Sequence, residues 1–141
     1  MARRSFLAAP LAVAIFGAWT TLVWLQRIAN IAGDDELVGG ERTFNFVRAA
    51  AFVIAGIAVL VVAMRPVSPG VRLRVVAAAG LVTAALWVQR FITIPGNGHT
   101  TGFVVVHMVL GAISIGLALW AFVAVRPAAQ RRESPEVPGL L

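Results

Sequence analysis

Eight polar side chains interrupt long apolar stretches of this 141-residue chain, and their types could bind or react. They are Gln26, Arg27, Asn45, Arg48, Gln89, Arg90, Thr93 and His107. A charged residue at the centre of a membrane span costs roughly 2.5–3.5 kcal/mol on insertion scales, so its presence needs a reason. One interpretation is an anchor layer at the membrane interface. The other is an outward-facing cavity that binds a polar or anionic head group, lined by Gln26, Arg27, Arg48, Gln89, Arg90 and His107.

Arg48 is the most conspicuous of these residues because it lies inside its apolar stretch. It follows Phe44 by four residues, which places it roughly 6 Å along a helix. From there its side chain can extend outward to water, or turn inward and pair with an acid of the segment 34–41.

Other chemistry has little support in the sequence. His107 stands alone in its stretch, and no ligand spacing with His99 or the acids predicts a metal site or a haem. The chain has no Cys, which excludes thiol chemistry. It also lacks nucleotide-binding and Ser/His/Asp motifs, and no carboxylate lies in an apolar stretch to serve a proton-coupled carrier. We therefore expect no enzymatic activity, no metal and no cofactor.

The elements that must position the polar residues are four apolar runs. They cover Phe6–Gln26, Phe44–Met64, Val75–Ile94 and Phe103–Val125. Each run is long enough, as a helix, to cross the ~30 Å hydrocarbon core of a bilayer. The hydrophobic content of 60% is also above that of ordinary soluble domains. The predicted fold class is an all-α integral membrane protein, a four-transmembrane-helix bundle in residues 1–127, with an outer loop at 28–43 and a mobile tail at 128–141.

The positive charge lies on one side of this predicted topology. All twelve basic residues are Arg, and eight of them lie near the N-terminus, between the second and third runs, or in the tail. With Glu133 and Glu136 that side carries 8 − 2 = +6, whereas the other side carries 4 − 4 = 0. The positive-inside rule then places both termini in the cytoplasm. No arginine cluster is interleaved with aromatics on a soluble element, so we expect no nucleic-acid partner.

The N-terminus resembles a twin-arginine export motif, because Phe6 and Leu7 follow closely after Arg3 and Arg4. The apolar run is long for a signal peptide and no clear cleavage site follows it, so we interpret it as an uncleaved first helix. Arginine without lysine is typical of a GC-rich bacterial genome. We therefore expect a multi-pass protein of the bacterial plasma (inner) membrane.

Two halves of the chain resemble each other. The segment 22–28 matches 85–91 at an offset of 90 − 27 = 63, and both contain Trp-x-Gln-Arg. The segment 63–66 matches 124–127 at an offset of 126 − 65 = 61, and both end in Arg-Pro. These matches predict two tandem helical hairpins related by a pseudo-twofold axis along the membrane normal. Convergence of simple apolar sequences remains the alternative.

Two further groups of residues are expected to place the helices. Interfacial anchoring in an aromatic belt is predicted for Trp24, Trp87 and Trp120. Small residues at four-residue spacing predict faces on which helices approach closely, although an alanine-rich composition explains them equally well. They are Ala14, Ala18, Ala51, Ala55, Gly80, Ala84, Ala112 and Gly116.

The preferred functional hypothesis is a non-catalytic accessory or assembly subunit of a larger bacterial membrane complex, such as a lipid-transport or respiratory assembly. It rests on the small size and on the missing catalytic motifs. The alternative is a small oligomeric carrier or channel with an outward-facing vestibule lined by Arg and Gln. A membrane-embedded enzyme or haem protein depends on His107 alone. Expected partners are membrane lipids and either other integral membrane subunits or further copies of the chain.

Overall fold

The computed structural model describes residues 2–130, and its secondary structure there consists of four helices. They are α1 (Ala2–Ala32), α2 (Gly39–Met64), α3 (Pro69–Thr93) and α4 (Thr101–Gln130). All four are long and apolar enough to cross a membrane. The prediction of an all-helical fold is confirmed, and helices of this length and composition indicate a multi-pass membrane protein.

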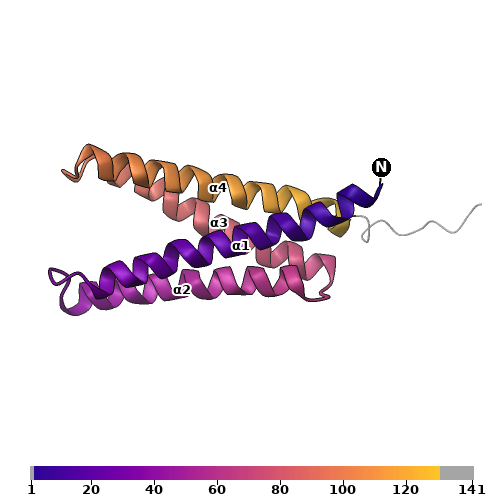
Figure 1. Ribbon diagram of the computed structural model, residues 1–141, viewed down its shortest axis with the longest axis horizontal. Coiled ribbons are helices and arrows are strands. Elements are labelled where there is room, and N and C mark those ends of the chain that lie inside the picture. The colour runs from indigo at the N-terminus through magenta and orange to yellow at the C-terminus, as the bar shows by residue number, and fades with distance from the viewer. Residues whose placement is uncertain (1, 131–141) are drawn as a thin grey trace, which may run out of the picture.

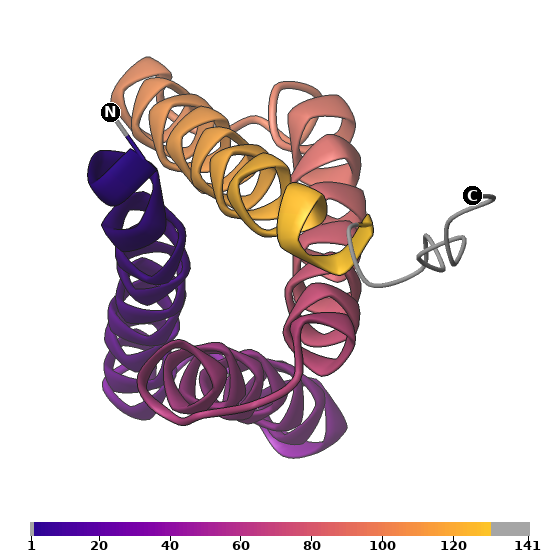
Figure 2. The same cartoon turned by 90° about the vertical axis from the view of Figure 1, so that its right-hand side faces the viewer.

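The helices alternate in direction, so each one packs beside the next and α4 returns to lie beside α1 (Figure 2). Contact is most extensive between α1 and α2, followed by α3 and α4, and it is slightest between α2 and α3. The bundle therefore consists of two tightly packed hairpins, α1–α2 and α3–α4, that touch each other less closely.

The two hairpins diverge along the bundle axis (Figure 1). They meet at the end that carries the start of α1, the end of α4 and the connection 65–68. We call this the closed end. They separate toward the end that carries the connections 33–38 and 94–100, which we call the open end. The arrangement is a wedge rather than a parallel-sided bundle.

The connection between α1 and α2 differs from the predicted outer loop at 28–43. It covers only residues 33–38, because α1 continues to Ala32 and α2 already begins at Gly39. The Asp34 carboxylate accepts a hydrogen bond from the backbone N–H of Glu36 at 3.1 Å, and Gly39 adopts a φ of 55° that favours glycine. The Arg42 guanidinium donates to the carbonyl of Ala32 at 2.9 Å and so caps the end of α1.

The connection at the closed end, residues 65–68, is shorter still. Ser68 caps α3 by accepting a hydrogen bond from the backbone N–H of Val71 at 3.3 Å, and Pro69 begins the helix. Arg72 donates to the carbonyl of Val62 at 2.9 Å and of Arg65 at 3.3 Å, which caps the end of α2. The start of α3 is thereby fixed against the end of α2.

The predicted tail is only partly described. Residues 128–130 continue α4, which contains Pro127 inside it, and residues 131–141 lie outside the described part.

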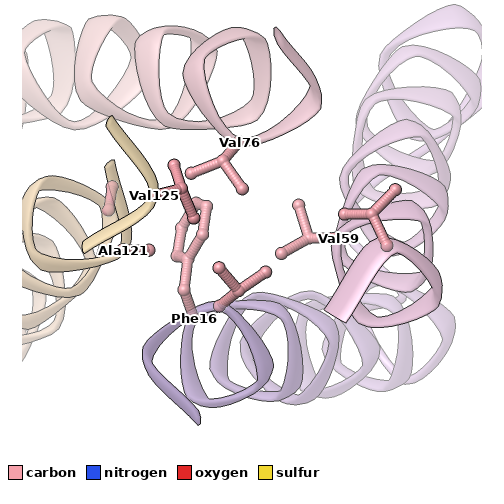
Figure 3. Packing of buried hydrophobic residues seen from close by; sticks show 8 residues of the cluster. Phe16, Val59, Val76, Ala121 and Val125 are labelled. Carbon is pink, nitrogen blue, oxygen red and sulfur yellow. The ribbon is translucent and has the colours of Figure 1, made fainter. Parts of the chain in front are cut away.

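The closed end is filled by an apolar plug to which all four helices contribute (Figure 3). Phe16 of α1 and Val76 of α3 are fully buried there, and Val59 of α2 and Val125 of α4 are nearly so. The whole plug consists of Val13, Phe16, Val59, Val62, Val76, Ala118, Ala121 and Val125. Within lipid such a cluster stabilises the bundle through dispersion contacts rather than through removal of water.

Glycines decide how closely the helices of each hairpin approach. A Cβ at Gly56 would lie 2.9 Å from the backbone N of Thr21, and a Cβ at Gly17 would lie 2.9 Å from the backbone N of Leu60. A Cβ at Gly111 would overlap the ring of Phe91. These three glycines, which the sequence analysis did not select, permit the tightest helix contacts.

The predicted small-residue stripes occupy mixed positions. Gly80 faces α4, because a Cβ there would lie 3.5 Å from the Cβ of Ala118. A Cβ at Gly116 would meet nothing within 4 Å in the described part of the chain. The half-buried members are Ala14, Ala18, Ala55, Gly80 and Ala84, and the exposed members are Ala51, Ala112 and Gly116.

Polar side chains lie on buried faces midway along the bundle. The Trp19 indole donates a hydrogen bond to the Ser114 hydroxyl at 2.9 Å, which links α1 to α4. The Ser114 hydroxyl in turn donates to the carbonyl of Leu110 at 2.7 Å. Thr20 and Thr83 are buried as well. The Trp19–Ser114 hydrogen bond holds α1 and α4 in contact midway along the bundle axis.

Candidate anion-binding cleft

Two adjoining cavities occupy the space in which the hairpins diverge. The larger, about 540 Å³, lies between α1, α3 and α4. The smaller, about 400 Å³, lies between α1, α2 and α3. Arg27, Asp34 and Arg90 border both cavities. The two cavities therefore form one site at the open end, which we call the cleft.

Three arginines from three different helices converge on the cleft. Arg27 lies on α1, Arg48 on α2 and Arg90 on α3, and all three are half-buried. All three border the smaller cavity, so their like charges repel one another there. Each arginine comes from a position about one turn or more inside its helix, so the helix backbones fix where the three charges lie.

The surroundings of Arg48 leave part of its guanidinium group without a partner. Its Nη2 donates to the Asn45 amide oxygen at 2.6 Å, and its central carbon lies 5.3 Å from the centre of the Phe44 ring. Its Nε atom is buried and has no hydrogen-bond partner among the residues described. Of the two orientations considered for Arg48, its position at the smaller cavity fits the inward one, but no acid of the described segment 34–41 accepts a hydrogen bond from it there.

Carboxylates compensate the charge of the cleft only in part. Asp34 and Glu41 border the smaller cavity with the three arginines, so the ionised side chains sum to 3 − 2 = +1. Within residues 9–130, the hydrogen bonds of these arginine side chains include none to a carboxylate. The cleft therefore presents unpaired N–H donors and a net positive charge, which is the chemistry that binds carboxylates and phosphates.

The deeper wall of the larger cavity is apolar and aromatic. Trp24 stacks on Phe52 with ring centres 4.2 Å apart and an interplanar angle of 11°. Trp87 lies against Gly111, at which an added Cβ would be 2.7 Å from the indole Cε3. The rest of this wall is formed by Val23, Leu86, Val106 and Leu110.

Trp24 and Trp87 therefore differ from the predicted aromatic belt. Their exposed fractions are 6% and 5%, whereas Trp120 is 45% exposed on α4. Trp24 follows Phe16 by eight residues, which brings both rings to the same inward face of α1. Two of the three expected anchors are thus part of the interior, where they border the larger cavity.

Two histidines border the larger cavity on either side of one aromatic ring. The centre of the Phe103 ring lies 4.4 Å from that of His99 and 3.9 Å from that of His107. Nδ1 of His107 lies 2.8 Å from the carbonyl oxygen of Phe103. Because a carbonyl only accepts, this contact requires a proton on Nδ1. Among the described residues, no three His, Asp or Glu side chains are grouped so that they could hold a metal ion.

The structure places all six predicted binding residues along the cleft. Gln26 and His107 border the larger cavity, Arg48 and Gln89 border the smaller, and Arg27 and Arg90 border both. Gln26 also donates to the Asn30 amide oxygen at 3.0 Å.

The sequence analysis did not identify Asp34 and the two buried tryptophans as cleft residues. The spacing of Trp24 from Phe16 was a signal that could have identified one of them.

The cleft therefore combines a positively charged mouth with an apolar wall. No family model, no curated protein and no solved structure matches this chain.

Proposed function

We propose that this chain is a non-catalytic membrane protein that binds an anionic ligand in the cleft between its two helical hairpins. The observation that carries the proposal is the convergence of Arg27, Arg48 and Arg90 without a hydrogen-bonded carboxylate. Charge-assisted hydrogen bonds to an anion would supply the missing acceptors and reduce the mutual repulsion of the three charges.

An anchor layer explains the arginines less well. An anchoring arginine extends its side chain to water along the outside of its helix, where its N–H groups are hydrated. Here the three arginines border the cleft between the helices rather than the outside of the bundle, and Nε of Arg48 is buried without a partner within the part described. Burial of charge of this kind is retained most readily where it serves a ligand.

The closed end bears on how such a ligand is used. The apolar plug around Phe16 and Val76 fills the bundle axis there, so the cleft does not continue through the closed end. This favours a subunit that holds or presents its ligand to a larger bacterial membrane assembly over a channel. The second candidate, a small oligomeric carrier, requires the plug to open.

We also propose that the two hairpins are a tandem repeat related by a pseudo-twofold axis along the membrane normal. The matched positions have matched environments, which supports a common origin. Trp24 and Trp87 are buried at the same cavity, and Arg27 and Arg90 border both cavities. Ile31 and Ile94, which keep the offset of 63, are 1% and 2% exposed. The ligand would then bind close to the axis, between the paired arginines.

The orientation is part of the same proposal. The closed end carries the arginine excess, and the positive-inside rule assigns it to the cytoplasm of a bacterial plasma membrane. The cleft would accordingly face the outside of that membrane.

The experiment that tests anion binding is a fluorescence titration in neutral detergent with inorganic phosphate as the probe. Trp24 and Trp87 border the cleft and should report occupancy by a saturable change in emission. Replacing Arg90 by Gln should weaken binding by about 10-fold or more, because a hydrogen bond to a charged group contributes about 1.5–3 kcal/mol. The matched control is Arg74→Gln, on the same helix but at the closed end. The absence of a saturable response in the unmodified protein, or equal losses in both variants, contradicts the proposal.

A further inference from the structure

The shape and lining of the larger cavity point to a specific class of ligand. We infer that the cleft binds one anionic phospholipid of the surrounding bilayer, with its phosphate at Arg27 and Arg90 and its acyl chains leaving between α1 and α4. This inference rests on the proposed anion-binding function and names its ligand.

The first argument is size. The larger cavity has a volume of about 540 Å³, which lies within the range of roughly 300–1,000 Å³ typical of pockets for organic ligands. A small tetrahedral oxyanion needs only a fraction of that space, so a ligand that uses the cavity carries a substantial part beyond its charged group.

The second argument is the order of polarity along the cavity. Its mouth carries Arg27, Arg90 and Asn30, whereas Val23 and Trp24 lie about one helical turn deeper on α1. A ligand that satisfies both regions has a charged group joined to an apolar group. Phospholipids have this arrangement, and the two arginines and Asp34 that border this cavity sum to 2 − 1 = +1, which favours a lipid of net negative charge.

The third argument is an opening toward the membrane. Val106 of α4 borders the larger cavity and is 54% exposed, so the neighbouring helices leave much of its surface uncovered. Toward the closed end, the Trp19–Ser114 hydrogen bond joins α1 to α4 and marks where the gap between these helices ends. In this proposal the cavity opens to the lipid through that gap, at the level at which a phospholipid of the same leaflet presents its head group.

The smaller cavity has room for the polar head group of the lipid. It adjoins the phosphate position through Arg27 and Arg90, and it is bordered by polar groups of Asn45, Gln89 and Thr93. These groups are hydrogen-bonding partners for a hydroxylated head group such as glycerol. Phosphatidylglycerol is therefore the lipid that we choose as the probe.

The test is native mass spectrometry of the full chain, released from neutral detergent after incubation with phosphatidylglycerol or phosphatidylcholine. We expect one bound phosphatidylglycerol per chain and at least 10-fold less retention of phosphatidylcholine. Arg90→Gln should lower phosphatidylglycerol retention by about 10-fold, and Arg74→Gln should leave it unchanged.

A second pair of variants tests the route of the acyl chains. Val106→Trp places a bulky ring in the opening and should abolish lipid retention without removing any arginine. The control is Val105→Trp, because Val105 is 53% exposed but does not border the cavity. Equal retention in these two variants would overturn the lateral route.

The outcomes separate the two proposals. Saturable binding of inorganic phosphate that depends on Arg90, combined with no preference for phosphatidylglycerol, refutes the lipid inference and leaves the anion-binding function in place. Failure of both phosphate and phosphatidylglycerol to bind refutes both. Binding of phosphatidylglycerol that is lost in Arg90→Gln and in Val106→Trp supports both.

Discussion

Replacement of Gly56 by Ala is expected to loosen the α1–α2 hairpin. The added Cβ would lie 2.9 Å from the backbone N of Thr21 and 3.1 Å from the carbonyl oxygen of Gly17. Both are backbone atoms of α1, so no side-chain rotation can relieve the contact. The same Cβ would also lie 2.5 Å from the Thr21 hydroxyl oxygen, which accordingly must move as well.

The magnitude follows from these distances. Ordinary contacts of a Cβ begin at 3.4 Å, so the helices must separate locally by about 3.4 − 2.9 = 0.5 Å. Such a shift reduces the dispersion contacts along the tightest interface of the bundle. Overpacking of this kind costs about 1–3 kcal/mol of unfolding free energy, and the better helix propensity of Ala returns less than about 1 kcal/mol. We expect a net loss of about 1–2 kcal/mol.

The measurement is reversible unfolding in mixed detergent micelles, followed by circular dichroism. Gly116→Ala is the matched control, because its Cβ would meet nothing within 4 Å in the described structure and it lies on the exposed face of α4. We expect this control to be neutral or slightly more stable. Equal stability of Gly56→Ala and Gly116→Ala would refute the close packing of α1 against α2.

Two further predictions concern single hydrogen bonds and use the same unfolding assay. Arg72→Ala should lower the unfolding free energy by about 1 kcal/mol, because the last carbonyls of α2 lose their cap, whereas the exposed Arg74→Ala should not. Trp19→Phe should cost about 0.6 kcal/mol, the average for a hydrogen bond between membrane helices, by removing the donor to Ser114. An unchanged Trp19→Phe variant would show that α1 and α4 are held together by apolar contacts alone.

The number of helices and their order could be predicted from the sequence, because each apolar run is as long as a membrane is thick. The ends of the helices could not. Hydropathy falls at Arg27, yet α1 continues for five further residues to Ala32. Its end is set by the Asp34 turn and by the Arg42 cap, and these depend on backbone contacts between two helices rather than on composition.

The polar residues of the cleft could also be selected from the sequence, since charges inside apolar runs are costly. Their convergence required the rotation of each helix about its own axis. That rotation is determined by close contacts such as that of Gly17 with Leu60. The sequence analysis predicted Ala14 and Ala18 as the packing residues of this helix, and Gly17 lies one residue before Ala18. For the same reason Trp24 was assigned to the membrane surface although its ring points into the bundle.

The wedge has a mechanical consequence. Arg27 lies 27 − 16 = 11 residues beyond Phe16 on α1, which is roughly 16 Å of lever arm from the plug. Rotating one hairpin by ~5° about the plug moves its arginine by roughly 1.4 Å. A small shift of the valines in the plug therefore produces a larger displacement of the helices at the open end. Repulsion between Arg90 on one hairpin and Arg27 and Arg48 on the other opposes such closure, and an anion bound as proposed would reduce that repulsion. If the cleft binds an anion as proposed, its occupancy and the angle between the two hairpins would therefore be coupled.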